Sequence, residues 1–220
     1  MNRVEDALME SKYFSRMEGE DSVLVHCRRD VRQLGLEYYR IVKTAVGSEP
    51  VAAHKEFGLD MADQAYMLAS MADSQFADLA RGGLPYSVTF NRDMHDAIAC
   101  PEDRSTAFHQ EIMEAAASAT TFGSQTLSWK LRYLSWRLQH WQACQGLVRA
   151  DPDLGRLVFS LPEGVELPRI AEMSAGELMG LALASRGRFR LLQTVPARLA
   201  TTFSDANALQ IGRASCRERV

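Results

Sequence analysis

The sequence predicts a mainly α-helical protein made of two similar units in tandem, and three features lead to this fold class. Residues 57–80 are repeated at 159–182 with a constant separation of 102 residues and no gap, as expected for tandem units. Each copy follows a long stretch with helical apolar spacing, and each precedes a short strand position, at 86–90 and 186–192. Identical residues occupy six pairs of positions: Phe57/Phe159, Leu59/Leu161, Ala69/Ala171, Met71/Met173, Leu79/Leu181 and Ala80/Ala182.

The stretches 24–45 and 127–148 predict two long helices, each of about six turns with one apolar stripe. Gln145 is the only polar residue in the second stripe. The two stripes are separated by 100 residues rather than 102. The sequence therefore predicts a connection two residues longer after the second long helix, around residues 151–153. The apolar positions are Leu24, Cys27, Val31, Leu34, Tyr38, Ile41 and Ala45, and then Leu127, Leu131, Leu134, Leu138, Trp141 and Val148.

Each repeated stretch predicts two short helices joined by a tight corner. In the second copy, Ser174 and Glu177 form a capping box directly before an apolar pair, which marks the start of a helix. The first copy has Ala72 in place of Ser174, so Asp73 is the expected cap there. A short helix over 51–57 precedes the first copy and ends at Gly58.

These elements divide the chain into five segments. The order is a charged lead-in at 1–20, a first unit at 21–99, a connecting region at 100–125, a second unit at 126–210, and a separate ending at 211–220. The connecting region contains a linker with Cys100 and Pro101, a small Ala-rich helix over 106–119, and a loop over 120–125. A solvated loop is expected around His95, and a final helix near Pro196.

The last ten residues resemble a sequencing adapter translated in one reading frame, so we exclude them from fold prediction. A genuine basic tail is the alternative. They contain three Arg and one Glu, and without them the formal net charge changes from −3 to −5. On this interpretation the natural chain differs after about residue 209.

Composition predicts a cytoplasmic protein that is not an enzyme and has no membrane span, metal or cofactor. Hydrophobic residues make up 46% of the chain, yet no run of about 18 apolar residues occurs and the first residues lack the pattern of a signal peptide. Cys27, Cys100 and Cys144 are too widely spaced for a zinc site or a disulfide framework. Phosphate-binding glycine loops, nucleophile elbows and zinc-protease His pairs do not occur.

Two groups of arginines are candidates for contact with DNA. If residues 186–190 form a strand, Arg186, Arg188 and Arg190 lie on one face and can contact successive phosphates. Protection of an edge strand by charge is an equally good explanation. The second group lies on the polar side of the first long helix, where a solvated surface is the simpler explanation, and comprises Arg28, Arg29 and Arg32.

The two-helix unit has the outline of a helix-turn-helix, but its second helices favour packing over base reading. Base-reading helices present Arg, Lys, Gln or Asn to base edges, whereas Asp78 and Glu177 would face phosphates. We therefore expect the apolar residues of these units to form contacts between units or with a partner. The candidates are Phe57, Phe76, Leu79, Leu138, Trp141 and Leu178.

The pattern resembles FlhD, the helical subunit of the FlhD–FlhC transcriptional activator. The residues that carry the resemblance are Phe57-Gly58-Leu59, Met71, Phe76, Leu79-Ala80 and Phe90 in the first copy, and Phe159, Met173, Ser174, Leu178, Leu181-Ala182 and Phe189 in the second. The resemblance implies a regulator of flagellar or conjugative-transfer genes that acts with an FlhC-like, zinc-bearing partner and meets DNA only in that complex. FlhD is one unit that dimerises, so a tandem implies an internal pseudo-dimer; a homo-oligomer is also open. The alternative is a helical protein-interaction module of a mobile genetic element that does not bind DNA.

Overall fold

The computed structural model describes residues 22–59, 68–80, 84–122 and 124–192. Helices predominate in these residues, which confirms the mainly α fold class, and the two short strands form one sheet. The predictions for 1–20, for a helix near Pro196 and for 211–220 lie outside the described residues. The elements are α2 (Ser22–Ser48), α3 (Pro50–Phe57), α5 (Asp73–Ala80), β1 (Tyr86–Val88), α6 (Arg92–Ala99), α7 (Ser105–Phe122), α8 (Ser124–Ala150), α9 (Pro152–Val158), α10 (Leu167–Glu172), α11 (Ala175–Ala184) and β2 (Phe189–Leu191).

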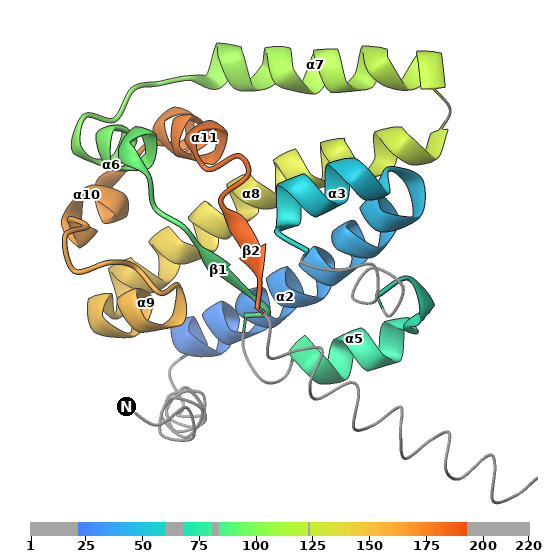
Figure 1. The fold of residues 1–220 in the computed structure, drawn as a ribbon. Coiled ribbons are helices and arrows are strands. Elements are labelled where there is room, and N and C mark those ends of the chain that lie inside the picture. The colour runs from blue at the N-terminus through green and yellow to red at the C-terminus, as the bar shows by residue number, and fades with distance from the viewer. Residues whose placement is uncertain (1–21, 60–67, 81–83, 123, 193–220) are drawn as a thin grey trace, which may run out of the picture.

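The long helices α2 and α8 pack side by side in opposite directions and form the centre of the molecule (Figure 1). Lys130 at the start of α8 pairs with Glu49 just after α2, at 2.9 Å. Further along α8, the indole Nε1 of Trp136 donates to the carbonyl oxygen of Leu34 at 2.9 Å. An aromatic donor bonded to a helix carbonyl fixes how the two helices are placed along each other.

Strands β1 and β2 form an antiparallel ribbon in front of this helix pair (Figure 1). Ser87 is opposite Arg190, with Tyr86 opposite Leu191 and Val88 opposite Phe189. In the same view α3 and α9 lie at opposite ends of the helix pair, α11 and α5 occupy the other two corners, and α7 crosses the top. The ribbon therefore joins one strand from each predicted unit.

The core between the ribbon and the helix pair is aromatic. Tyr38, Trp136 and Phe189 are fully buried, and their rings lie within about 5 Å of those of their neighbours. The Tyr38 hydroxyl donates to the carbonyl oxygen of Phe189 at 3.2 Å. Buried aromatic side chains contribute large apolar areas and favourable edge-to-face contacts, so both predicted units share one core.

The starts of α2 and α8, of α3 and α9, and of α5 and α11 are each 102 residues apart, whereas β1 and β2 are 103 apart. The longer connection predicted after the second long helix is wrong. Helices α2 and α8 both contain 27 residues, and in each case one residue separates them from the next helix. Helix α2 continues three residues past the predicted end at residue 45, where the Ser48 hydroxyl and the Glu49 amide donate to the carbonyls of Thr44 and Ala45. The internal duplication itself stays a prediction.

Capping contacts confirm the start of α11 and correct the start of α5. The Ser174–Glu177 capping box is present in full. At α5, the side chain of Gln75 accepts from the Ala72 amide at 2.8 Å, whereas Asp73 pairs with Arg40 at 2.9 Å instead of capping. Gln75 therefore supplies half of a capping box, and the predicted Asp73 cap is wrong.

Two predicted loops are helical. Residues 92–99 form α6, which begins where the Asn91 side chain accepts from the Met94 amide and which buries Met94 and Ile98. The predicted loop over 120–125 is replaced by the end of α7 at Phe122 and the start of α8 at Ser124. Within the described ranges, we find no helix that is long and apolar enough to cross a membrane.

Candidate functional site

The three arginines of the predicted strand do not form a ladder on one strand face, and that geometric prediction is wrong. Strand β2 begins only at Phe189, and residues 185–187 form a turn in which Gly187 has a φ of +66°. A left-handed residue between Arg186 and Arg188 interrupts the alternation that a ladder needs. Each arginine consequently contacts a different part of the fold.

Arg186 is the most exposed of the three. Its side chain is 71% exposed, and its Nη1 lies 3.9 Å from Oε1 of Glu111 on α7. Glu111 is bound more closely by the buried Arg137, whose Nη2 donates to the same oxygen at 3.1 Å and whose Nη1 donates to the carbonyl oxygen of Ala182 at 3.0 Å. The guanidinium of Arg186 thus remains available for an external anion, while Arg137 ties α7, α8 and α11 together.

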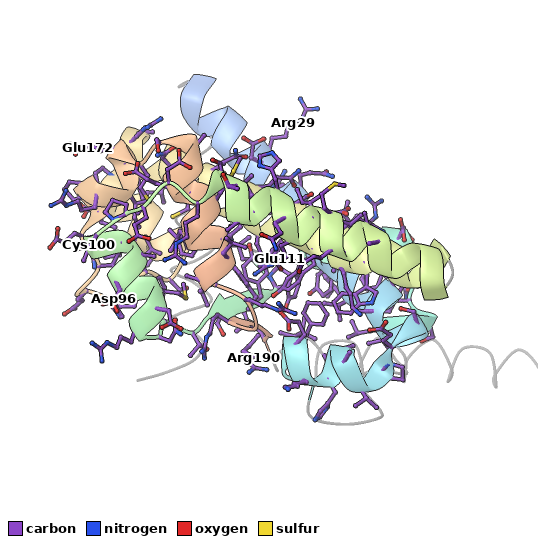
Figure 2. The ribbon with its side chains drawn as sticks, turned by 90° about the horizontal axis from the view of Figure 1, so that it is seen from above. Arg29, Asp96, Cys100, Glu111, Glu172 and Arg190 are labelled. Carbon is purple, nitrogen blue, oxygen red and sulfur yellow. The ribbon has the colours of Figure 1, made fainter. Side chains whose placement is uncertain are left out.

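Arg190 is a structural residue at the end of α3. Its Nη1 donates to the Lys55 carbonyl oxygen at 3.0 Å, and its positive charge is favourable at a helix C-terminus. Its side chain packs over Gly58, where an added Cβ would lie 2.6 Å from the Arg190 Cδ. Figure 2 shows Arg190 next to α3.

Arg188 lies between these two contacts and is half-buried. Its Nε is buried without a hydrogen-bond partner in the part of the chain that the structure describes. Close by, Oε1 of Glu56 accepts from the Gly187 amide at 2.8 Å and so holds the turn against α3. We use the name α3–β2 face for the exposed Lys55 together with the arginines at 186, 188 and 190.

The α2 arginines belong to a different surface. Arg29 and Arg32 are exposed, and the side chain of Arg28 lies outside the described residues. Figure 2 places Arg29 and Arg190 on opposite sides of the body. The two predicted groups of arginines therefore do not combine into one site.

The predicted interface residues pack inside this chain. Phe57, Phe76 and Trp141 are fully buried, Leu178 is almost so, and Leu79 and Leu138 are partly buried against the core. Phe76 stacks on Tyr39 with ring centroids 5.1 Å apart, and the Trp141 indole donates to the Ser185 hydroxyl at 3.2 Å. A contact of these residues with another protein stays a prediction.

A groove that was not expected from the sequence lies between α2 and α8. It consists of two adjoining hollows of about 390 and 420 Å³ that share Gln33 and Gln139. One hollow extends to Gln142, and the other to the ion pair between Arg132 and Glu37 at 2.7 Å. Three glutamines on the polar flanks of the long helices were the signal that could have indicated it.

A third hollow, of about 490 Å³, lies between α6, the segment 100–104 and α11, and is acidic. It is lined by Asp93, Asp96, Glu102 and Glu177, and Figure 2 shows Asp96 and Cys100 on this side of the molecule. Hydrogen bonding from the Ser174 amide lowers the pKa of Glu177. Among the described residues, no group of His, Cys, Asp and Glu side chains is arranged to hold a metal ion.

Comparison of the chain with protein-family models, with curated proteins and with solved structures finds no match.

Proposed function

We propose that the chain is the helical subunit of a transcription regulator similar to FlhD, which acts with an FlhC-like protein on flagellar or conjugative-transfer genes. The observation that supports this proposal is the pairing of the two predicted units: α2 packs antiparallel on α8, and β1 pairs with β2. Two units that share one core are what an internal pseudo-dimer of FlhD-like subunits requires.

In this proposal the α3–β2 face supplies phosphate contacts, and Arg186 is the principal contact. Lys55 and Arg186 are exposed, whereas Arg190 is already bonded to the Lys55 carbonyl oxygen. A chain with a formal net charge of −3 is repelled by DNA, because phosphate neutralisation drives most non-specific binding. The partner must therefore contribute the larger share of the positive charge.

The test is salt-dependent binding of the purified complex to a random-sequence duplex and to the region upstream of the neighbouring genes. The complex is prepared with the product of the FlhC-like reading frame that this proposal places next to the gene. We expect Arg186→Ala to weaken binding to both duplexes about equally, and to reduce the salt slope by roughly 0.9 for the lost phosphate contact. Arg92→Ala is the matched control, because its side chain is 92% exposed on α6, beside the acidic hollow.

An unchanged salt slope in the Arg186→Ala complex would remove this arginine from the DNA interface. Tight DNA binding by the chain without its partner would contradict the partner-dependent proposal.

The second candidate is a helical protein-interaction module of a mobile genetic element that does not bind DNA. The engagement of Arg190 inside the chain and the half-burial of Arg188 favour it, since both reduce the charge available to phosphates. On this alternative the purified complex with the partner forms normally, but neither duplex binds it.

A further inference from the structure

Helices α2 and α8 make contacts at equivalent positions, and we call residues counterparts when they are 102 positions apart in the two predicted units. The Trp136 indole donates to the carbonyl oxygen of its own counterpart, Leu34. Two bonds from side chains to carbonyl oxygens also recur at this spacing, namely Lys43–Met71 and Gln145–Met173. Contacts between counterparts and reciprocal contacts are the pattern that a twofold axis produces. An approximate axis of this kind therefore passes between α2 and α8, close to Trp136.

The two hollows of the groove between α2 and α8 lie on either side of this axis. Asp30 lines the hollow of about 390 Å³, and its counterpart Arg132 lines the hollow of about 420 Å³. Glu37 lines the second hollow, and its counterpart Gln139 lines both. We call them the Asp30 hollow and the Arg132 hollow. Their equivalent positions allow the side chains of the two hollows to be compared directly.

The Arg132 hollow contains a pair between a guanidinium and a carboxylate of this chain. Nε and Nη2 of Arg132 both donate to Oε1 of Glu37, at 2.9 and 2.7 Å. The two side chains are 38% and 23% exposed, so the pair lies partly within the surface. An arginine on α8 thus satisfies a carboxylate on α2.

The Asp30 hollow has a carboxylate and a carboxamide at the equivalent positions. Asp30 on α2 takes the place of the arginine, and Gln139 on α8 takes the place of the glutamate. Both are exposed, and among the described residues neither side chain has a hydrogen-bond or ion-pair partner. Because an aspartate is shorter than an arginine, this hollow has room for a guanidinium that the chain itself does not supply.

We propose that the Asp30 hollow binds an arginine side chain of a partner protein. The carboxylate of Asp30 accepts two N–H groups of the guanidinium, and the side-chain oxygens of Gln33 and Gln139 accept others. The methylene groups of the arginine pack on Leu34, the buried residue of this hollow. A lysine ammonium lacks the planar fork of donors, so the hollow distinguishes arginine from lysine.

The length of the groove favours a polypeptide over a free small molecule. The groove continues from one hollow into the other, and its residues on α8 run from Leu131 to Gly146. At 1.5 Å per residue this is about 22 Å, the length of an extended segment of about six or seven residues. Nothing lies within 4 Å of a Cβ added at Gly146, so the backbone of a partner can approach α8 closely there.

This inference goes beyond the proposed function and does not depend on it. The probe is a library of displayed seven-residue peptides with arginine fixed at the centre and random residues elsewhere, and a matched library has lysine at the centre. We expect only the arginine library to give binders of the full-length chain. In NMR spectra, the best binder should shift the side-chain NH₂ signals of Gln33, Gln139 and Gln142. Arginine blocked at both ends should bind at least about 100-fold more weakly, since it makes no further contacts along the groove.

Two variants test the role of the hollow in binding the selected peptide. Asp30→Asn should weaken binding about tenfold or more, because it removes the charge of a bidentate pair. Asp153→Asn is the matched control on α9, where the side chain is exposed, and it should leave the affinity unchanged. The double variant Asp30→Arg with Gln139→Glu reproduces the Arg132–Glu37 pair in this hollow and should abolish binding. Circular dichroism should show the wild-type fold in both variants, since the changed side chains are exposed.

Three results would overturn the proposal. The first is an arginine library that gives no binder, or a lysine library that gives binders of equal affinity. The second is a selected peptide whose affinity changes in neither Asp30→Asn nor the double variant, which places its binding elsewhere. The third is blocked arginine that binds as tightly as the selected peptide, which indicates a free small molecule as the ligand.

Discussion

Among individual residues, His140 is a titratable residue whose side chain is completely buried. Its Nδ1 lies 2.9 Å from the Tyr86 hydroxyl, and its Nε2 has no hydrogen-bond partner in the described part of the chain. Burial lowers the pKa of His140 to about 3, because the ring would carry its charge in an aromatic core. A histidine next to a tryptophan on a long helix is more often half-buried at the surface, so the complete burial of His140 is not evident from the sequence.

The depressed pKa of His140 predicts a loss of stability in acid. In the unfolded chain His140 takes up a proton at an ordinary histidine pKa near 6.5. In the folded chain its ring stays neutral down to about pH 3. The free energy of unfolding should therefore fall between about pH 6.5 and 3, by up to about 1.4 kcal/mol per pH unit. Denaturant unfolding across this range should show a shallower loss in His140→Gln than in wild type, with the exposed His95→Gln as control. Equal pH dependence in wild type and His140→Gln would contradict this account.

The sequence shows that Gln145 is a polar residue in an apolar stripe, but it does not show which groups its side chain bonds. The side-chain Nε2 donates to the carbonyl oxygens of Ile170 at 3.0 Å and Met173 at 2.7 Å, at the end of α10. These acceptors are 25 and 28 residues away, so helical periodicity within α8 could not indicate them.

Among the elements, α3 and α9 are both followed by a residue in the left-handed region, but the residue differs. Gly58 has a φ of +65°, and Ser160, which lies 102 residues later, has a φ of +50°. A non-glycine residue in this region costs roughly 1–2 kcal/mol. Ser160→Gly should therefore stabilise the chain by about 0.5–1 kcal/mol after the added freedom of the unfolded state is subtracted. Gly58→Ser should destabilise it, and denaturant unfolding that shows the reverse order would contradict this prediction.

Gly176, near the start of α11, leaves room for the segment that packs against this helix. Segment 101–104 lies against it: the Arg104 amide donates to the Gly176 carbonyl oxygen at 3.1 Å, and an added Cβ at Gly176 would clash with the Asp103 carboxylate. That carboxylate also accepts from the Ser105 amide at the start of α7, at 2.9 Å. Gly176→Ala should cost about 0.5–2 kcal/mol of stability, because the Asp103 carboxylate must move away from the new Cβ and lose its bond from the Ser105 amide.

The matched control is Gly146→Ala in α8, where nothing lies within 4 Å of an added Cβ. Helix propensity alone should make it stabilising by about 0.5–1 kcal/mol. Thermal unfolding midpoints that move in the same direction for both variants would disprove the steric explanation.

Elements with strong local signals were predictable, and those fixed by distant contacts were not. The long helices, the turn at Gly58 and the capping box at Ser174 all depend on neighbouring residues. Helix α6 was missed because it has only two buried apolar residues, Met94 and Ile98. The interruption at Gly187 was missed because Glu56, from a distant helix, holds that turn.

At the scale of the whole molecule, the candidate site was the least predictable part. Alternation along a strand placed the three arginines together, but tertiary contacts distribute them among α3, α7 and the ribbon. The groove between α2 and α8 exists only because two helices 102 residues apart in sequence pack side by side. Periodicity identifies the buried face of each helix, but it does not determine which other helix covers that face.

A core shared by both predicted units implies that they unfold together. The three tryptophans of the chain, Trp129, Trp136 and Trp141, all lie on α8 in the second unit. Ile41 lies on α2 in the first unit and is fully buried.

Truncation of such a side chain to Ala costs about 2–5 kcal/mol. We therefore expect Ile41→Ala to lower the denaturant midpoint equally by tryptophan fluorescence and by circular dichroism. Met113→Ala, at a side chain that is 69% exposed, should move neither midpoint. The contrary result is that Ile41→Ala leaves the fluorescence midpoint unchanged and splits the dichroism transition into two steps. The units would then unfold independently, and the ribbon and the α2–α8 contact would contribute little to stability.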